Sequence, residues 1–542
     1  MSARALLAAG LVVSFPGVLH ADPASNQPAP QTTNAPVTPA PTSSPVPSPL
    51  PTATATPTPV PLLANPPTSG VAIGATSIVH LLGVYGNATA TVLNPALLDA
   101  SVDQGTRILT LSGKALGDTA VVVSDARGMN VVIPVHVAYS AGTIADEVTL
   151  HLTGDPASAE YVRERAALAA QRAAQPRAGA TIVAPPDGLS AQPLAQDDIE
   201  NVDVPVILQG SQYFTAQGTT RVIVQNRATP RVAPDQLMVS DYPETLTANG
   251  ELFTADLTFG NPSRFLYFHY NPPGQPDRRI VLRLENPGDE PALVQIIGGG
   301  GGPGPNEMEV GHRSTQRFLS HLAQNEGQLY DVPAKSSINA IEHDLPARSV
   351  VAATLQLRVL SGGTVHLTLF AQNASDSPDA AIAGTDLLTS SVRHARGVYR
   401  VPEFYYNDLW NVTDPYLQLS IGQIPLPNLL QGEALSGDYG VMQSFSIHIV
   451  NPTSTPQAIA IYENPRGGRA TATFLIDRTI VQSHGTPAFS RYKVRQYTVP
   501  AQGYINVDIV TMPDAGSSYP LRLEFAPDDG SVAPGAPGSP IY

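Results

Sequence analysis

Five aromatic side chains occur between residues 404 and 416, in a chain that contains a single Trp. Aromatic faces stack on sugar rings or on the side chains of a partner, and short amides and carboxylates between them bind hydroxyl groups. The spacing predicts a glycan or protein contact site. Its predicted residues are Tyr405, Tyr406, Trp410, Tyr416, Asp408 and Asn411. The favoured interpretation, however, is a buried aromatic corner at the point where the second β-sandwich begins.

Signatures of catalysis and of metal binding are missing. The sequence has no G-x-S-x-G, H-E-x-x-H or G-x-x-x-x-G-K-[ST] motif, so we assign no catalytic residue and do not expect an enzyme. The densest histidines are His312, His321 and His343, but the nine-residue spacing of the first two puts them on opposite faces of a predicted helix. We expect no metal ion and no cofactor. The protein could still be an enzyme if carboxylates that are scattered in the sequence converge in space.

Two other segments could bind ions. The acidic run Asp197, Asp198, Glu200 and Asp203 lacks the spacing of a calcium loop, which favours a solvated linker. The glycine run 298–302 precedes a predicted helix over 307–324, and such loops can hold anions. Glu307 and Glu309 would repel a phosphate from the first turn of that helix. The glycine run is therefore interpreted as a flexible connection that ends in a helix cap.

Composition and charge exclude several classes of protein. Thirty Lys and Arg face 45 Asp and Glu, so the net charge of -15 argues against nucleic-acid binding and against docking on anionic lipid. The absence of Cys excludes disulfides, thiolate metal sites and a lipidated Cys anchor.

The first 71 residues predict export. Residues 1–21 have the basic and apolar regions of a signal peptide, and no later window is apolar enough for a membrane span. Retention of this segment as an anchor is the alternative. Residues 22–71 are rich in Pro, Thr and Ser and predict a disordered linker stiffened toward polyproline II. We expect an exported protein in the periplasm or at the cell surface of a bacterium.

The remaining chain is predicted to be mainly β and multidomain. Short β-branched runs with a four-residue turn at Asp125–Gly128 predict an immunoglobulin-like sandwich over 72–140. The run Leu111–Gly128 resembles bacterial immunoglobulin-like domains and the N-terminal domain of pilus-assembly secretins. That resemblance implies an extracytoplasmic β module without catalytic residues. Residues 141–205 hold one predicted helix, capped by Asp155, between two strands, which indicates a small α/β module.

An internal repeat fills the last 340 residues. Asn286-Pro287 and Asn451-Pro452 each stand between two alternating runs, and Asn-Pro is typical of a tight strand–turn–strand corner. Two related β-sandwiches are predicted, over 206–375 and 398–529, with a linker over 376–397 and a flexible tail over 530–542. In the alignment, 351–360 corresponds to 504–511 and 365–370 to 521–525.

One resemblance covers residues 204–528. Tyr242-Pro-Glu244, Gly250-Glu-Leu-Phe253 and Arg264–Asn271 precede the first corner, and Gly437–Val441 precedes the second. This order resembles an exported family best known from cyanobacteria, which carries no assigned active site. The resemblance implies export and a β architecture.

Taken together, these patterns predict an exported, non-enzymatic cell-envelope protein with a structural or binding role. One alternative is a carbohydrate-binding surface protein that acts through the aromatic residues around Trp410. The other is a periplasmic component of a pilus or secretion apparatus. The expected partners are cell-wall polysaccharide or envelope proteins.

Overall fold

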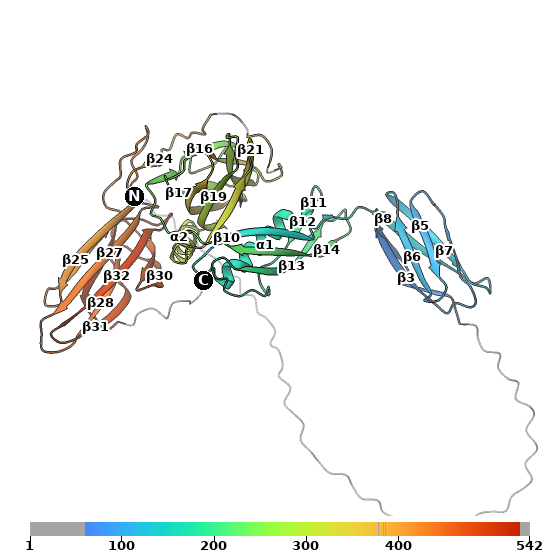
Figure 1. Ribbon diagram of the computed structural model, residues 1–542, viewed down its shortest axis with the longest axis horizontal. Coiled ribbons are helices and arrows are strands. Elements are labelled where there is room, and N and C mark those ends of the chain that lie inside the picture. The colour runs from blue at the N-terminus through green and yellow to red at the C-terminus, as the bar shows by residue number, and fades with distance from the viewer. Residues whose placement is uncertain (1–59, 378, 383, 385, 532–542) are drawn as a thin grey trace, which may run out of the picture. The chain divides into compact units, whose positions relative to one another are not determined.

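The protein is mainly β in the computed structural model, which describes residues 60–531 except 378, 383 and 385. The predicted signal peptide, most of the predicted linker and most of the predicted tail lie outside the described residues. The described part contains two helices, and all its other regular elements are strands (Figure 1).

The first module is a β-sandwich of two four-stranded sheets, ordered β1-β3-β6-β5 and β2-β8-β7-β4. Alternate residues such as Val121, Val123, Ile133 and Val135 point into one core between the sheets, which confirms the immunoglobulin-like prediction. The module begins earlier than residue 72, because β1 and most of β2 lie inside the predicted linker. Its strands are β1 (Leu63–Asn65), β2 (Ser69–Ala72), β3 (Thr76–Leu82), β4 (Thr89–Val92), β5 (Leu98–Asp103), β6 (Ile108–Gly113), β7 (Gly117–Ser124) and β8 (Asn130–Ala138).

The second module packs helix α1 (Ala159–Ala173) on strands. Its strands are β9 (Gly142–Thr143), β10 (Glu147–Thr153), β11 (Gln175–Pro176), β12 (Thr181–Val183), β13 (Ile199–Gln209) and β14 (Ala216–Asn226). The helix buries Tyr161, Val162, Ala166 and Ala170. Its N-cap is Ser158, whose hydroxyl accepts from the backbone N–H of Tyr161, and not the predicted Asp155.

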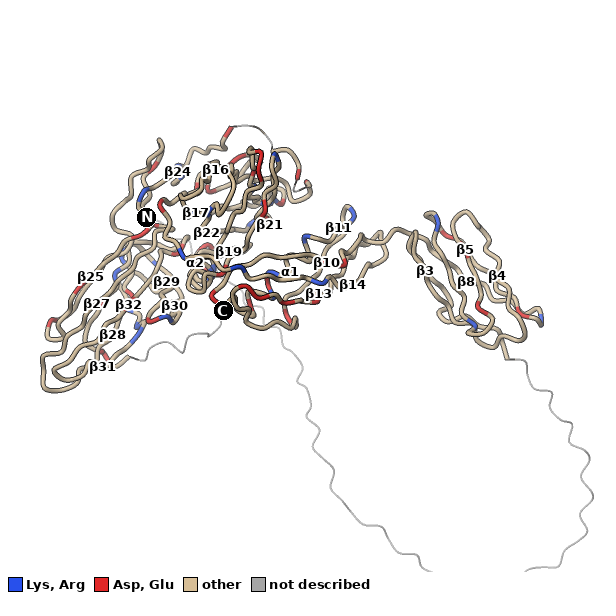
Figure 2. Tube along the Cα trace, in the orientation of Figure 1, with Lys and Arg blue, Asp and Glu red and all other residues tan. Residues whose placement is uncertain are grey.

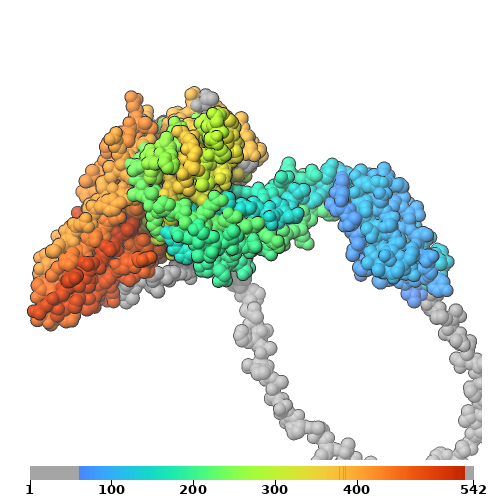
Figure 3. Space-filling view, viewed as in Figure 1, coloured from blue at the N-terminus to red at the C-terminus, as the bar shows by residue number. Residues whose placement is uncertain are grey.

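This second module is not separate from the first predicted sandwich. One ten-stranded sheet runs β12-β13-β14-β10-β20-β19-β22-β17-β15-β24. The predicted boundary between residues 205 and 206 therefore falls inside β13, and the predicted linker over 376–397 contains the start of β24. In the space-filling view the two parts form one continuous surface (Figure 3).

A four-stranded sheet, β16-β23-β18-β21, covers one face of this long sheet. Phe265, Tyr267, Val294 and Ile296 belong to the core between them. The strands are β15 (Gln236–Ser240), β16 (Gly250–Leu257), β17 (Ser263–Asn271), β18 (Arg278–Asn286), β19 (Ala292–Gly304), β20 (Gly327–Val332), β21 (Ser336–Leu345), β22 (Ser349–Ser361), β23 (Val365–Asn373) and β24 (Arg396–Tyr399). β17 is buried on both faces.

Helix α2 (Glu307–Ala323) lies directly on β19. A Cβ atom on Gly299 would overlap the backbone of Phe318, and one on Gly301 would overlap the carbonyl oxygen of Val310. Glycine at these positions allows the helix and the strand to approach this closely. The glycine run is thus part of a strand, and the predicted flexible connection is wrong. The predicted cap is correct, since the side chain of Asn306 accepts from the N–H of Glu309.

The second sandwich pairs a five-stranded sheet, β25-β27-β32-β29-β30, with a four-stranded sheet, β26-β33-β28-β31. Its core contains Trp410, Phe445, Phe474 and Phe525. The strands are β25 (Glu403–Asn411), β26 (Leu417–Ile421), β27 (Met442–Asn451), β28 (Gln457–Pro465), β29 (Ala470–Ile476), β30 (Thr479–Thr486), β31 (Tyr492–Val499), β32 (Gly503–Pro513) and β33 (Leu521–Pro527).

The two copies of the predicted repeat share the same hydrogen bonds at their Asn-Pro corners. Asn286 donates to the carbonyls of Glu290 and Val332 and accepts from the N–H of Gly288. Asn451 makes the matching bonds to Thr455, Val499 and Thr453. Each corner carries the chain from one sheet of its sandwich to the other.

The later strands of the repeat do not correspond in the predicted way. β22 pairs with β19, the strand after the first corner, whereas its predicted equivalent β32 pairs with β27, the strand before the second corner. Likewise, β23 pairs with β18, the strand before the first corner, whereas its predicted equivalent β33 pairs with β28, the strand after the second corner. Sequence similarity at the corner therefore does not extend to the order of the sheets.

Candidate functional site

The predicted aromatic cluster does not form one surface. Alternation along β25 leaves the side chain of Tyr405 exposed (67%), while Trp410 is only 1% exposed and lies in the sandwich core. Tyr406 stacks on Phe445, with 4.8 Å between ring centroids. Trp410 is thus not placed to touch a ligand at the surface.

Four of the predicted residues lie outside that core. Tyr405, Asp408 and Tyr416 are exposed, and Asn411 uses its side-chain oxygen to bind the backbone N–H of Thr413. A contact with a glycan or a protein through these side chains stays a prediction.

A better-formed site is a cavity of about 210 Å³ lined by α1, by β21 and by the face of the ten-stranded sheet that α2 does not cover, with Arg317 as its lining residue from α2. We call it the arginine pocket, after Arg165, Arg172 and Arg317, which line it. Its floor is the sheet face that carries Gly298, Gly300 and Gly302. The other lining residues include Tyr161, Tyr267, Tyr330, Glu342 and His343. In Figure 2, charged positions of both signs lie near α1 and α2.

The floor exists because β19 loses a partner. β20 pairs with Ala292–Ile296 only, which leaves the following glycines without that neighbour strand. Side chains replace it: His321 donates to the carbonyl of Gly298 (2.7 Å), Arg317 to that of Gly300 (3.2 Å) and His343 to that of Gly302 (3.4 Å). Because no side chain rises from the glycines, the space above them stays open.

The three arginines differ in how their donors are used. Arg172 donates to the carbonyl of Ala340 (2.8 Å) and Arg317 to that of Gly300. Arg165 lies over the ring of Tyr161, 5.1 Å from its centroid, and its buried Nε has no hydrogen-bond partner among the described residues. A buried N–H without a partner is costly, so a ligand that accepts from it would be stabilised.

The pocket is positive in a protein that is acidic overall. Its one lining carboxylate, Glu342, already lies 3.6 Å from Arg279, which does not line the pocket. Nε2 of His343 donates to a carbonyl, so Nδ1 accepts from the hydroxyl of Tyr267 (3.2 Å), and burial lowers the pKa of His343. The histidine is therefore neutral, and three guanidinium groups set the charge of the pocket.

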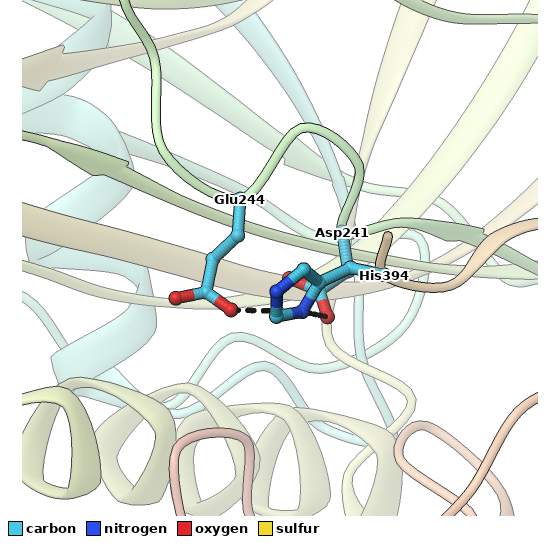
Figure 4. Close-up of side chains that lie close together, drawn as sticks. All are labelled: Asp241, Glu244 and His394. Atoms are coloured by element: carbon cyan, nitrogen blue, oxygen red, sulfur yellow. Dashed lines mark ion pairs between the residues drawn. The ribbon is translucent and has the colours of Figure 1, made fainter. Parts of the chain in front are cut away.

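A second group of polar side chains joins Asp241, Glu244 and His394, which we call the acid–histidine cluster (Figure 4). Nδ1 of His394 lies 2.9 Å from Oε2 of Glu244 and 3.5 Å from Oδ2 of Asp241. Burial raises the pKa of Asp241 to about 7, while its hydrogen bond raises the pKa of His394.

Sequence reasoning missed both groups. The arginine pocket takes residues from positions 161 to 355, and its glycines alternate between the helix side and the pocket side. The cluster joins a loop at 241–244 to a histidine 150 residues later. The one local signal was Asp241-Tyr-Pro-Glu244, which places two carboxylates in a short loop.

No protein-family model matches the chain, and no curated protein matches its sequence. It is similar to solved β-rich structures at low identity and low TM-score. Domains 5–6 of the S-layer protein SbsC are 14% identical over 31% of this chain and 98% of that chain, with a TM-score of 0.14.

Two further matches cover more of this chain. SGBP-B of a Bacteroides ovatus mixed-linkage glucan utilization locus, in complex with a heptasaccharide, is 12% identical over 56% of this chain and 71% of that chain, with a TM-score of 0.12. The M60 catalytic domain with two CBM51 domains of Clostridium perfringens ZmpB is 8% identical over 81% and 55%, with a TM-score of 0.15. Scores this low carry no functional information. Neither of the two described helices is long and apolar enough to cross a membrane.

Proposed function

We propose that this protein is an exported, non-enzymatic binding protein of the cell envelope, and that the arginine pocket is its binding site. The signal-like N-terminus and the Pro-rich segment after it support export. The observation that carries the binding role is Arg165, whose buried Nε faces no acceptor in the described structure although two further guanidinium groups line the same cavity.

The chemistry of the pocket selects a carboxylate. Guanidinium groups bind carboxylates through paired, charge-assisted hydrogen bonds. The cavity of about 210 Å³ is smaller than a drug-sized pocket and suits one small acidic unit. The rings of Tyr161 and Tyr330 add apolar surface at its wall. We infer that the ligand is the uronic acid unit of an acidic envelope polysaccharide, held by its carboxylate.

The test is isothermal titration calorimetry of the full chain with glucuronate, with glucose as the uncharged match. We expect glucuronate to bind and glucose not to bind. Arg165→Gln should weaken binding by about tenfold or more, since hydrogen bonds to charged groups are worth about 1.5–3 kcal/mol. Arg163→Gln on the same helix is the control, because Arg163 does not line the pocket. Equal affinity of the Arg165→Gln and Arg163→Gln variants for glucuronate, or no binding of glucuronate by the wild type, would contradict the proposal.

A second candidate function rests on the exposed rings of Tyr405 and Tyr416, which are 67% and 53% exposed. These rings could bind a neutral cell-wall polysaccharide by stacking. Tyr405→Ala should then reduce co-sedimentation of the full chain with insoluble cell-wall material. Unchanged co-sedimentation would remove this candidate and leave the arginine pocket unaffected.

A further inference from the structure

The acid–histidine cluster is held in place by its surroundings. β15 and β24 pair antiparallel, with Ser240 opposite Arg396. The next backbone bond, from Asp241 N–H to the carbonyl of Ala395 (2.9 Å), brings Asp241 beside the segment that carries His394. The register of two strands, and not a flexible loop, sets the distance between these ligands.

The loop that carries Glu244 is tied down as well. The backbone carbonyl of Glu244 accepts from Tyr270, and His269 donates to the carbonyl of Pro243. Tyr242 is buried, its hydroxyl donates to the carbonyl of Ser390, and Arg396 packs against its ring at 4.8 Å. These contacts fix both ends of the loop, so the carboxylates of Asp241 and Glu244 are presented in one arrangement.

The three polar atoms have the spacing of a coordination shell. In a tetrahedral zinc site with bonds of about 2.0–2.1 Å, neighbouring ligand atoms are about 3.3 Å apart. The two distances from Nδ1 of His394, 2.9 Å and 3.5 Å, lie on either side of that value. All three ligand atoms lie within 4.8 Å of one another. Each side chain keeps between 26% and 32% of its surface exposed, so an ion could enter from solvent.

A second observation, independent of the spacing, indicates a cation. Oδ1 of Asp241 is buried and has no hydrogen-bond partner among the described residues. A buried carboxylate oxygen is normally bonded to a donor or a metal. Glu307, in the first turn of α2, adds a further negative charge that acts on Asp241 and Glu244. Arg396, on the strand that follows His394, is occupied by Tyr242 and by the carbonyl of Leu388.

We propose that Asp241, Glu244 and His394 bind one divalent transition-metal ion, with Zn²⁺ the best fit, and leave a fourth position open to solvent. Two carboxylates and one imidazole suit this ion, and thiolates are not required. The ion ties the loop after β15 to the segment before β24. It stabilises the edge of the ten-stranded sheet, where β24 is the last strand.

The experiment titrates the full chain, first stripped with a chelator, with ZnCl₂ in a calorimeter, and with Co²⁺ while visible absorption is recorded. We expect one site, the visible bands of a low-coordinate Co²⁺ ion and a Zn²⁺-dependent rise in Tm. His394→Ala should weaken Zn²⁺ binding by more than about 100-fold, because even outer-shell changes cost 10–100-fold.

The matched control is His366→Ala, which removes a histidine paired with a single carboxylate, Asp256, at 2.9 Å. This control should bind Zn²⁺ like the wild type. Glu244→Gln provides a milder second variant in case His394→Ala does not fold, and it should also lose the site. Absence of Zn²⁺ binding by the wild type, or Zn²⁺ binding by the His394 and Glu244 variants that is as tight as that of the wild type, would overturn the proposal and leave the cluster a simple ion pair.

Discussion

Glu463 is the single residue whose burial has the clearest consequence for stability. Its side chain is 0% exposed in β28, and burial raises the pKa of its carboxyl to about 8. It lies in the field of the buried pair His312–Asp514, whose polar atoms are 2.6 Å apart and which joins α2 to the second sandwich. Burial alone would lower the pKa of His312, but Asp514 outweighs it and the net pKa is raised.

Both groups make the protein less stable as the pH rises. The pKa of a glutamate in an unfolded chain is about 4.3, so the folded chain holds the Glu463 proton to a higher pH than the unfolded chain does. The free energy of unfolding therefore falls as the pH rises from about 4.3 to about 8. His312 is charged in its pair with Asp514 below its folded pKa and loses that stabilisation as the pH rises through it.

We predict that Glu463→Gln flattens this dependence. The wild type should lose on the order of 3 kcal/mol of unfolding free energy between about pH 5 and about pH 8, and the variant much less. Urea unfolding followed by Trp410 emission measures this, because the only Trp lies in the core of the second sandwich. Glu433→Gln, an exposed position, should keep the wild-type slope. A variant as pH-dependent as the wild type would show that Glu463 is not the group that titrates.

At the scale of elements, β19 has two different faces made from one run of glycines. Gly299 and Gly301 face α2 with no room for a Cβ atom, whereas a Cβ on Gly300 would meet only Cε1 of His343, at 3.7 Å. One face therefore serves helix packing and the other serves the arginine pocket.

We predict that Gly301→Ala destabilises the protein by at least about 1–3 kcal/mol, the usual cost of overpacking, because α2 must move off the strand. Gly300→Ala should change the unfolding free energy by less than about 1 kcal/mol and should weaken glucuronate binding, since the new methyl group enters the pocket. Urea unfolding and calorimetry separate the two effects. Similar stability losses in both variants would mean that the two faces are not distinct.

At the scale of the whole molecule, the units of folding differ from the predicted domains. The first module has its own core. The α/β module does not end at residue 205, because β13 pairs with β14 along its whole length and β10 pairs with both β14 and β20. It shares its sheet with the first sandwich.

We predict that a fragment of residues 61–140 folds alone and that a fragment of residues 141–205 does not. The second fragment lacks β14, β20 and part of β13, so β10, β12 and the rest of β13 have no partners to complete their hydrogen bonds. ¹H–¹⁵N NMR spectra test this: the spectrum of residues 61–140 should be well dispersed, and the spectrum of residues 141–205 should be poorly dispersed, as for an unfolded chain. A fragment of residues 141–542 should be as well ordered as the full chain. A dispersed spectrum for 141–205 would show that the shared sheet is dispensable.

The local elements of the fold could be predicted from the amino-acid sequence. Alternating apolar residues identified many strands, runs of helix formers predicted α1 and α2, and Asn286 and Asn451 marked two corners that share the same hydrogen bonds. These features depend on neighbours within a few residues, where backbone geometry and side-chain type are enough.

The pairing of strands and the contacts between distant side chains could not be predicted from the sequence and depend on the folded chain. A period of two assigns the faces of a strand but not its neighbours, so the exchange of β22 and β32 between the two copies could not be predicted. The fold also buries Trp410, makes a glycine run part of a strand and places His394 beside Asp241. Each of these depends on long-range contacts that the register of a sheet fixes and that local sequence does not encode.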